Sequence, residues 1–129
     1  MLKFGWSTLK VKDLDESVRF YTEVIGLKLS RRFNAGPESE IAFLGDGMYA
    51  GDGTTATEIE LICVKGSSTV SVGEDISWGF VVDSLDDTMA SLKEKGVAIH
   101  SGPFSPAPFI RFIYILDPNG FKLQLAEHL

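Results

Sequence analysis

The amino-acid sequence predicts an α+β fold built from two modules, each with the element order strand-helix-strand-strand-strand (βαβββ). The first observation behind this prediction is an internal echo, because VKDLDES at residue 11 returns as VDSLDDT at residue 82, an offset of 71 residues. The second is that the predicted helix after each echo ends at a glycine, Gly26 or Gly96. A repeated order of elements is typical of a duplicated structural unit.

The elements of the first module follow from its apolar spacing. Residues 4–11 alternate as a strand does, and Asp13 is expected to cap a helix because a carboxylate accepts hydrogen bonds from the free N–H groups of the first turn. Apolar residues then recur at helical spacing, namely Leu14, Val18, Tyr21 and Ile25. Gly26 is expected to end this helix. Further strands are expected at about 27–34, 40–44 and 57–64.

The second module is expected to repeat this order after a linker of small and polar residues. A strand ends at about Val82, a helix covers residues 85–95, and a short strand covers residues 97–100. The proline-rich stretch 100–109 is expected to be a loop, either a plain connection or a lid. The last two strands are expected at 109–116 and 121–127. The glycine-rich stretch 45–53 of the first module lacks the Lys-Ser/Thr of a phosphate loop, and we interpret it as a mobile connection.

Length, charge and cysteine content limit the class of protein. At 129 residues the chain fits one domain, with module one at about 1–66, a linker at about 67–75 and module two at about 76–129. The formal charge of −6 argues against a nucleic-acid partner, which calls for a basic surface. No apolar run approaches the roughly 18 residues of a membrane span. The single cysteine, Cys63, fits a reducing compartment, so we expect a cytoplasmic protein without a membrane partner.

A hairpin closes the sequence at residues 115–126. Pro118 fixes φ for the Asp-Pro-Asn-Gly turn and Gly120 accepts a positive φ without steric cost. Beyond the turn, Phe-Lys-Leu-Gln-Leu alternates as a strand. This strand-turn-strand run resembles the closing hairpin of the vicinal oxygen chelate superfamily. That superfamily includes glyoxalase I, bleomycin-binding resistance proteins, fosfomycin-resistance enzymes and extradiol dioxygenases.

The resemblance covers nearly the whole chain and implies an arrangement of the two modules. In this superfamily the two modules place their sheets around an open cup, as one cup-shaped mixed sheet with helices on the outside. Small proteins with this fold commonly pair, so the resemblance also implies a homodimer.

The resemblance further indicates where a metal ion would bind. In metal-using members, histidines and glutamates from the first and last strands of each module are the ligands. The matching positions here are Trp6, Glu60, Ser77 and Gln124. Only Glu60 is a common metal ligand, because tryptophan offers only an N–H donor and serine and glutamine are weak neutral ligands. We therefore expect no metal site and no cofactor.

Alternation along the strands predicts which residues face the cup and bind a ligand: Trp6, Thr8, Glu60, Ser77, Phe112, Tyr114 and Gln124. Aromatic walls with a few polar groups are typical of sites for small planar molecules. Glu60 is the candidate general acid or base, and the alternative is a solvated carboxylate or one paired with Lys10 or Lys122. For Trp6 the alternative to ligand stacking is a plug that fills the space of the lost metal.

Three functions remain open at this point. The first is a metal-independent protein that binds a small cationic or aromatic molecule, similar to the bleomycin-resistance branch. The second is a glyoxalase-like lyase or isomerase that uses Glu60, with or without a divalent metal. The third is a domain whose cup has closed over Trp6 and which acts only through its partners.

Overall fold

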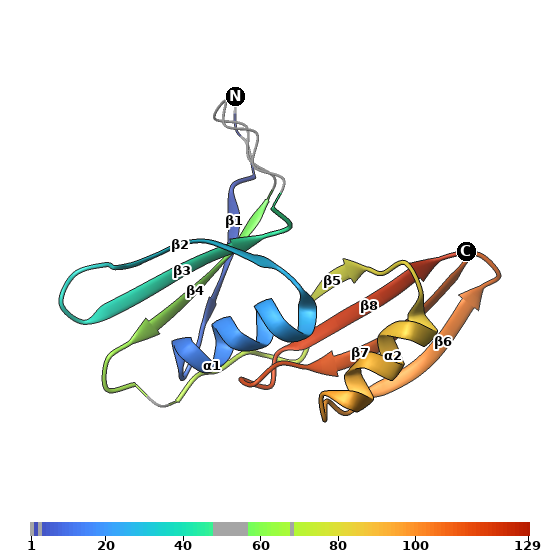
Figure 1. The fold of residues 1–129 in the computed structure, drawn as a ribbon. Helices are drawn as coiled ribbons and strands as arrows, with labels where there is room; N and C mark the ends of the chain where they lie inside the picture. The colour runs from blue at the N-terminus through green and yellow to red at the C-terminus, as the bar shows by residue number, and fades with distance from the viewer. Residues whose placement is uncertain (1, 3, 48–56, 68) are drawn as a thin grey trace. The chain divides into compact units, whose positions relative to one another are not determined.

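A computed structural model describes residues 2, 4–47, 57–67 and 69–129 and divides the chain into two compact units, Met1–Val72 and Gly73–Leu129 (Figure 1). Each unit contains a four-stranded mixed sheet and a helix between its first and second strands. The predicted α+β fold of two βαβββ modules is therefore confirmed. The boundary between the units falls inside the linker expected at 67–75.

The first unit is organised around a sheet in which the opening and closing strands are neighbours. Its strands are β1 (Trp6–Lys10), β2 (Lys28–Asn34), β3 (Ser39–Gly45) and β4 (Glu58–Val64), in the spatial order β1-β4-β3-β2. β1 and β4 run parallel, while β3 pairs antiparallel with both β4 and β2. Parallel neighbours need a long connection, and the helix with β2 and β3 provides it.

The helix of the first unit begins where the sequence predicts. α1 (Leu14–Arg19) is capped by Asp13, whose Oδ1 accepts a 3.0 Å hydrogen bond from the Glu16 amide. The helix continues as a π-helical segment, η1 (Phe20–Ile25), which the sequence did not predict. Gly26 ends it with φ of 91°, a left-handed conformation that glycine adopts without steric cost. α1 lies against β3 and β4 (Figure 1).

An ion-pair network joins three elements of the first unit through Arg32 of β2. The Arg32 guanidinium donates from Nε to Glu40 of β3 at 2.9 Å and from Nη2 to Asp15 of α1 at 2.7 Å. The hydrogen bond to Glu40, followed by the one to Asp15, raises the pKa of Arg32 above its ordinary value. Arg32 therefore stays charged at neutral pH.

The second unit repeats the topology of the first. Its strands are β5 (Ser77–Val81), β6 (Ser101–Ala107), β7 (Ile110–Leu116) and β8 (Lys122–His128), in the spatial order β5-β8-β7-β6. β5 and β8 run parallel, and β7 pairs antiparallel with both β8 and β6. β5 and β8 thus correspond to β1 and β4.

The helix of the second unit is α2 (Leu85–Glu94), which packs on β8. Ser84 caps it, with Oγ accepting a 3.2 Å hydrogen bond from the Asp87 amide. Glu127 of β8 adds a second cap, since its Oε1 accepts a 3.0 Å hydrogen bond from the Leu85 amide. This contact fastens the helix start to the closing strand of its own unit.

The structure corrects the prediction for residues 97–109. The expected short strand at 97–100 is irregular, and the stretch expected as a loop or lid forms strand β6. Proline is compatible with β6 because this strand lies at the sheet edge, where one side of the backbone needs no pairing partner. Its pairing with β7 shifts register on both sides of Phe104. The lid interpretation is therefore wrong.

The alternation of side chains sorts each sheet into a helix-covered face and a second face, which we call the helix-free face. Residues on the helix-covered faces are mostly buried, and Val11, Leu61, Ile113, Ile115 and Leu123 are fully enclosed. Most of the glycine-rich stretch at 45–53 lies outside the described residues. No helix within the described part of the chain is long and apolar enough to cross a membrane.

Candidate functional site

The helix-free face of the first sheet brings together three of the predicted site residues. In the parallel register of β1 and β4, Trp6 lies beside Glu58 and Thr8 lies beside Glu60. The hydroxyl of Thr8 donates a 2.7 Å hydrogen bond to Oε1 of Glu60. The register therefore places an indole, a hydroxyl and two carboxylates on adjacent strands.

Glu60 has no cationic partner among the described residues. The ion pairs within the described ranges involve neither Glu60 nor the two lysines that were alternatives for it, Lys10 and Lys122. Its neighbour Glu58 differs, because Glu58 accepts a hydrogen bond from the Ser30 hydroxyl at 2.5 Å and lies 3.6 Å from the Arg31 guanidinium. Glu60 thus presents a negative charge that is hydrogen-bonded but not neutralised.

Phe43 of β3 anchors an aromatic cluster on the same face. Trp6 meets it edge-on with ring centroids 5.5 Å apart, and Phe33 of β2 stacks on it at 6.2 Å. The Arg31 guanidinium lies 4.0 Å from the Phe43 ring centroid, within cation–π range. Phe43 is buried beneath these groups, whereas 53% of Trp6 remains exposed. Trp6 therefore offers an accessible aromatic surface on this sheet.

Phe43, Phe33 and Arg31 also belong to this face, although the sequence did not predict them there. Residues 41–44 are an unbroken apolar run, Ile-Ala-Phe-Leu, so alternation there does not tell one face from the other. The pairing of Phe43 with Glu60 across β3 and β4 shows that the two side chains lie on the same face of the sheet.

The helix-free face of the second sheet holds the other predicted site residues. Gln124 of β8 pairs with Gly79 of β5 on one side and with Tyr114 of β7 on the other, and Ser77 pairs with Lys122. The side-chain oxygen Oε1 of Gln124 lies over Gly79, 3.6 Å from where a β-carbon would stand. The small residues Ser77 and Gly79 of β5 therefore protrude little from this side of the sheet.

An aromatic cluster lies on the other side of the helix-free face of the second sheet, on β6 and β7. Phe112 and Tyr114 of β7 lie 5.7 Å apart, and Phe104 of β6 contacts both, at 5.5 and 6.4 Å between ring centroids. The ammonium of Lys122 lies 5.1 Å from the Tyr114 ring centroid. Phe104 joins this cluster because its segment is a strand. Alternation in the closing strand placed Lys122 beside Gln124, but its role as the cation of this face was not predicted.

The donor set does not fit a divalent metal ion in either unit. The first unit offers Glu58 and Glu60 beside Trp6, which cannot coordinate; Glu58 is already paired with Arg31, and one oxygen of Glu60 accepts from Thr8. The second unit offers Ser77 and Gln124. Lys122, which is positively charged, is the register partner of Ser77 on the neighbouring strand. No cluster of three or more histidine, cysteine, aspartate or glutamate side chains suited to a metal occurs in the described ranges.

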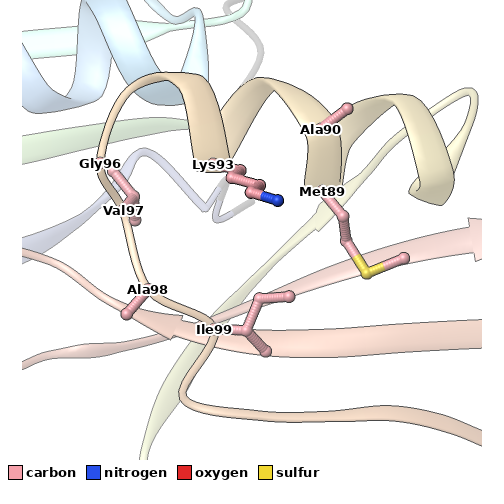
Figure 2. Close-up of a pocket in the computed structure, with 7 residues that line it drawn as sticks. All are labelled: Met89, Ala90, Lys93, Gly96, Val97, Ala98 and Ile99. Carbon is pink, nitrogen blue, oxygen red and sulfur yellow. The ribbon is translucent and has the colours of Figure 1, made fainter.

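The second unit also has a surface hollow beside α2. A surface hollow of about 550 Å³ lies between α2 and residues 96–99, where Met89 and Ile99 point toward one another (Figure 2). It contains none of the predicted site residues. His100 is exposed, and its amide donates a 2.7 Å hydrogen bond to the carbonyl of Tyr114.

The two helix-free faces have different chemistry. The first combines an exposed indole with an unneutralised carboxylate, which suits a ligand that is flat, positively charged or both. The second combines three aromatic rings with an ammonium and neutral polar groups.

The sequence is similar to one family of known proteins. The sequence model of the Glyoxalase/Bleomycin resistance protein/Dioxygenase superfamily matches residues 3–125. A Haemophilus influenzae protein named lactoylglutathione lyase is 32% identical over 127 residues, which cover 93% of this chain and 88% of the relative.

Solved structures with the same fold include both an enzyme and a binding protein. Glyoxalase I from Zea mays superimposes with a TM-score of 0.83 at 25% identity, over 98% of this chain and 47% of the maize chain. TnmS3, an antibiotic binding protein from Streptomyces sp. CB03234, superimposes with a TM-score of 0.71 at 22% identity, over 100% of this chain and 98% of that chain. The fold alone therefore does not choose between catalysis and binding.

Proposed function

Because the chain belongs to the Glyoxalase/Bleomycin resistance protein/Dioxygenase superfamily, yet has Trp6 where metal-using members place a ligand, we propose that it binds a small cationic or aromatic molecule without a metal ion. The observation that carries this proposal is the half-exposed Trp6 beside the unneutralised carboxylate of Glu60. The ligand-binding residues are those on the two helix-free faces: Trp6, Thr8, Glu60, Ser77, Phe112, Tyr114 and Gln124.

The physical basis is the pairing of a π face with a negative charge. Tryptophan is the aromatic side chain that attracts cations most strongly, and a carboxylate without a protein partner gains from a cationic ligand. Arg31 supports the same preference, because a guanidinium of this chain already lies between the Phe43 ring and Glu58. A planar amidinium or guanidinium ligand would find equivalent groups at Trp6 and Glu60.

The two tryptophans allow a direct test. Trp6 is half exposed, whereas Trp78 packs on Phe121 with ring centroids 4.7 Å apart on the helix-covered face of the second sheet. Naphthamidine, a flat cation, should quench tryptophan fluorescence saturably in chelator-treated protein. Trp78→Phe should keep the quenching and Trp6→Phe should abolish it. Absence of saturable quenching in the wild type would refute binding at this face.

Metal independence is tested by calorimetric titration of the chelator-treated protein with Ni²⁺, Zn²⁺ and Mn²⁺. We expect no one-to-one binding at micromolar concentrations, because three of the four positions lack a strong ligand. Tight binding that Glu60→Ala removes would overturn this part of the proposal.

A second candidate function is a lyase or isomerase with Glu60 as acid or base. Its support is the named lactoylglutathione lyase relative and the retained carboxylate at this one position. Formation of S-lactoylglutathione, followed by its thioester absorbance, tests this candidate. Turnover that Glu60→Gln abolishes and Glu58→Gln preserves would establish it in place of simple binding.

We also propose that the protein works as a cytoplasmic homodimer. The support is the family membership together with a single free cysteine, Cys63, which needs no oxidising compartment. Sedimentation analysis at micromolar concentration tests the assembly, and a monomer throughout would reject it.

A further inference from the structure

The polar groups on the helix-free face of the second sheet include several hydrogen-bond donors. Ser77 and Lys122 are direct partners in the register of β5 and β8, and Gln124 follows Lys122 on the same side of β8. A hydroxyl, an ammonium and an amide can each donate to an anion. The positions that hold metal ligands in metal-using relatives thus lie beside a positive charge here, which disfavours a metal cation.

Among the described residues, no carboxylate pairs with Lys122. None of the ion pairs within the described ranges includes it. Arg111 of the neighbouring strand provides the contrast, because it points to the helix-covered side and pairs with Asp86 at 3.3 Å and Glu127 at 4.0 Å. No aspartate or glutamate occupies a strand position on the helix-free face of this sheet. This face is therefore cationic in a chain whose formal charge is −6.

The shape of the face suits a flat ligand. Phe104, Phe112 and Tyr114 form a wall of rings on β6 and β7, and Gly79 provides no side chain on β5, on the other side of β8. A ring that lies against this wall brings its substituent toward β8. Lys122 is half-buried, and its ammonium lies over the Tyr114 ring, 5.1 Å from the ring centroid.

We propose that the second face recognises a planar aromatic anion, with the ring against Phe112 and Tyr114 and a carboxylate held by Lys122 and Gln124. This inference rests on the proposed binding function and assigns a ligand class to one of its two faces. Lys122 determines the preference for an anion, because its positive charge attracts a carboxylate and not a neutral or cationic ligand.

The test compares naphthoate with naphthamide, which share ring and attachment point and differ in charge. Affinity is measured by NMR titration, with the side-chain amide signal of Gln124 reporting on this face alone. Wild-type protein should bind naphthoate about tenfold more tightly than naphthamide, because hydrogen bonds to charged groups are stronger than neutral ones. Lys122→Gln should remove the difference, Lys122→Arg should keep it, and Lys93→Gln on the exposed side of α2 should leave it unchanged.

Different results separate the ways in which the proposal could fail. Equal affinity for the two probes, or a preference that survives Lys122→Gln, would overturn the assignment of an anion. Failure of both probes to shift the Gln124 signal would overturn aromatic binding at the second face. The proposed function at the first face is judged independently, by the quenching of Trp6 by naphthamidine.

Discussion

The Thr8 hydroxyl donates a 2.7 Å hydrogen bond to Oε1 of Glu60, and the two residues are direct partners in the parallel register of β1 and β4. One oxygen of the carboxylate is therefore fixed by the sheet. The other oxygen has no hydrogen-bond partner within the described residues, so it can accept a hydrogen bond from a ligand.

Thr8→Val should weaken the binding of naphthamidine about threefold. Valine keeps the shape of threonine but removes a hydrogen bond worth roughly 1 kcal/mol, so Glu60 loses its fixed orientation. Fluorescence titration of Trp6 measures the change, and Thr8→Ser, which keeps the hydroxyl, is the matched control. Identical affinities in wild type and Thr8→Val would mean that this hydrogen bond does not position the carboxylate.

Asp117→Ala should destabilise the protein by about 2 kcal/mol, because hydrogen bonds to charged groups are worth more than neutral ones. Asp117 is 5% exposed, and its carboxylate accepts from the Asn119 and Phe121 amides at 2.8 Å and from the Asn119 side chain at 3.1 Å. Urea unfolding gives the free energy, and the exposed Asp75→Ala is the control, expected within about 0.5 kcal/mol of wild type. A loss no larger than that of the control would show that the turn holds without its carboxylate.

Arg32→Met should cost about 1 kcal/mol, since the Asp15 and Glu40 carboxylates that pair with it are partly solvated and screened. The raised pKa means that the folded chain holds this proton more tightly than the unfolded chain. The contribution is complete below the unfolded pKa and is lost only as pH rises through the still higher folded value. The difference in unfolding free energy from wild type should therefore stay constant between about pH 6 and pH 9. Arg19→Met, which removes an exposed arginine of α1, is the control, and a difference that declines across this range would contradict the assignment.

Much of the fold could be predicted from the sequence because local signals agreed with the tertiary structure. Asp13 and Gly26 marked the first helix, and alternation in the closing hairpin placed Leu123 in the core and Gln124 on the opposite face. Strand β6 was missed because prolines are turn signals, while its position at the sheet edge, which permits them, is a tertiary fact.

The candidate site was predicted less completely than the fold. Trp6, Thr8 and Glu60 were placed on a common face because their strands alternate cleanly. Phe43 and Arg31 were not, because an apolar run and a shifted register in β2 hide which way those side chains point. The net charge of a face also depends on which side chains form ion pairs. Only the structure shows that Arg31 pairs with Glu58, while Glu60 has no cationic partner among the described residues.

The parallel pairing of the opening and closing strands has a consequence for synthesis of the chain. The partners Thr8 and Glu60 are separated by 52 positions in the sequence, so β1 leaves the ribosome long before its neighbour exists. Until β4 emerges, the nascent unit carries an unpaired strand edge of the kind that other chains can extend. The strand that brings the carboxylate of the proposed site is thus the same strand that completes the sheet, and no shorter nascent segment can display the first face.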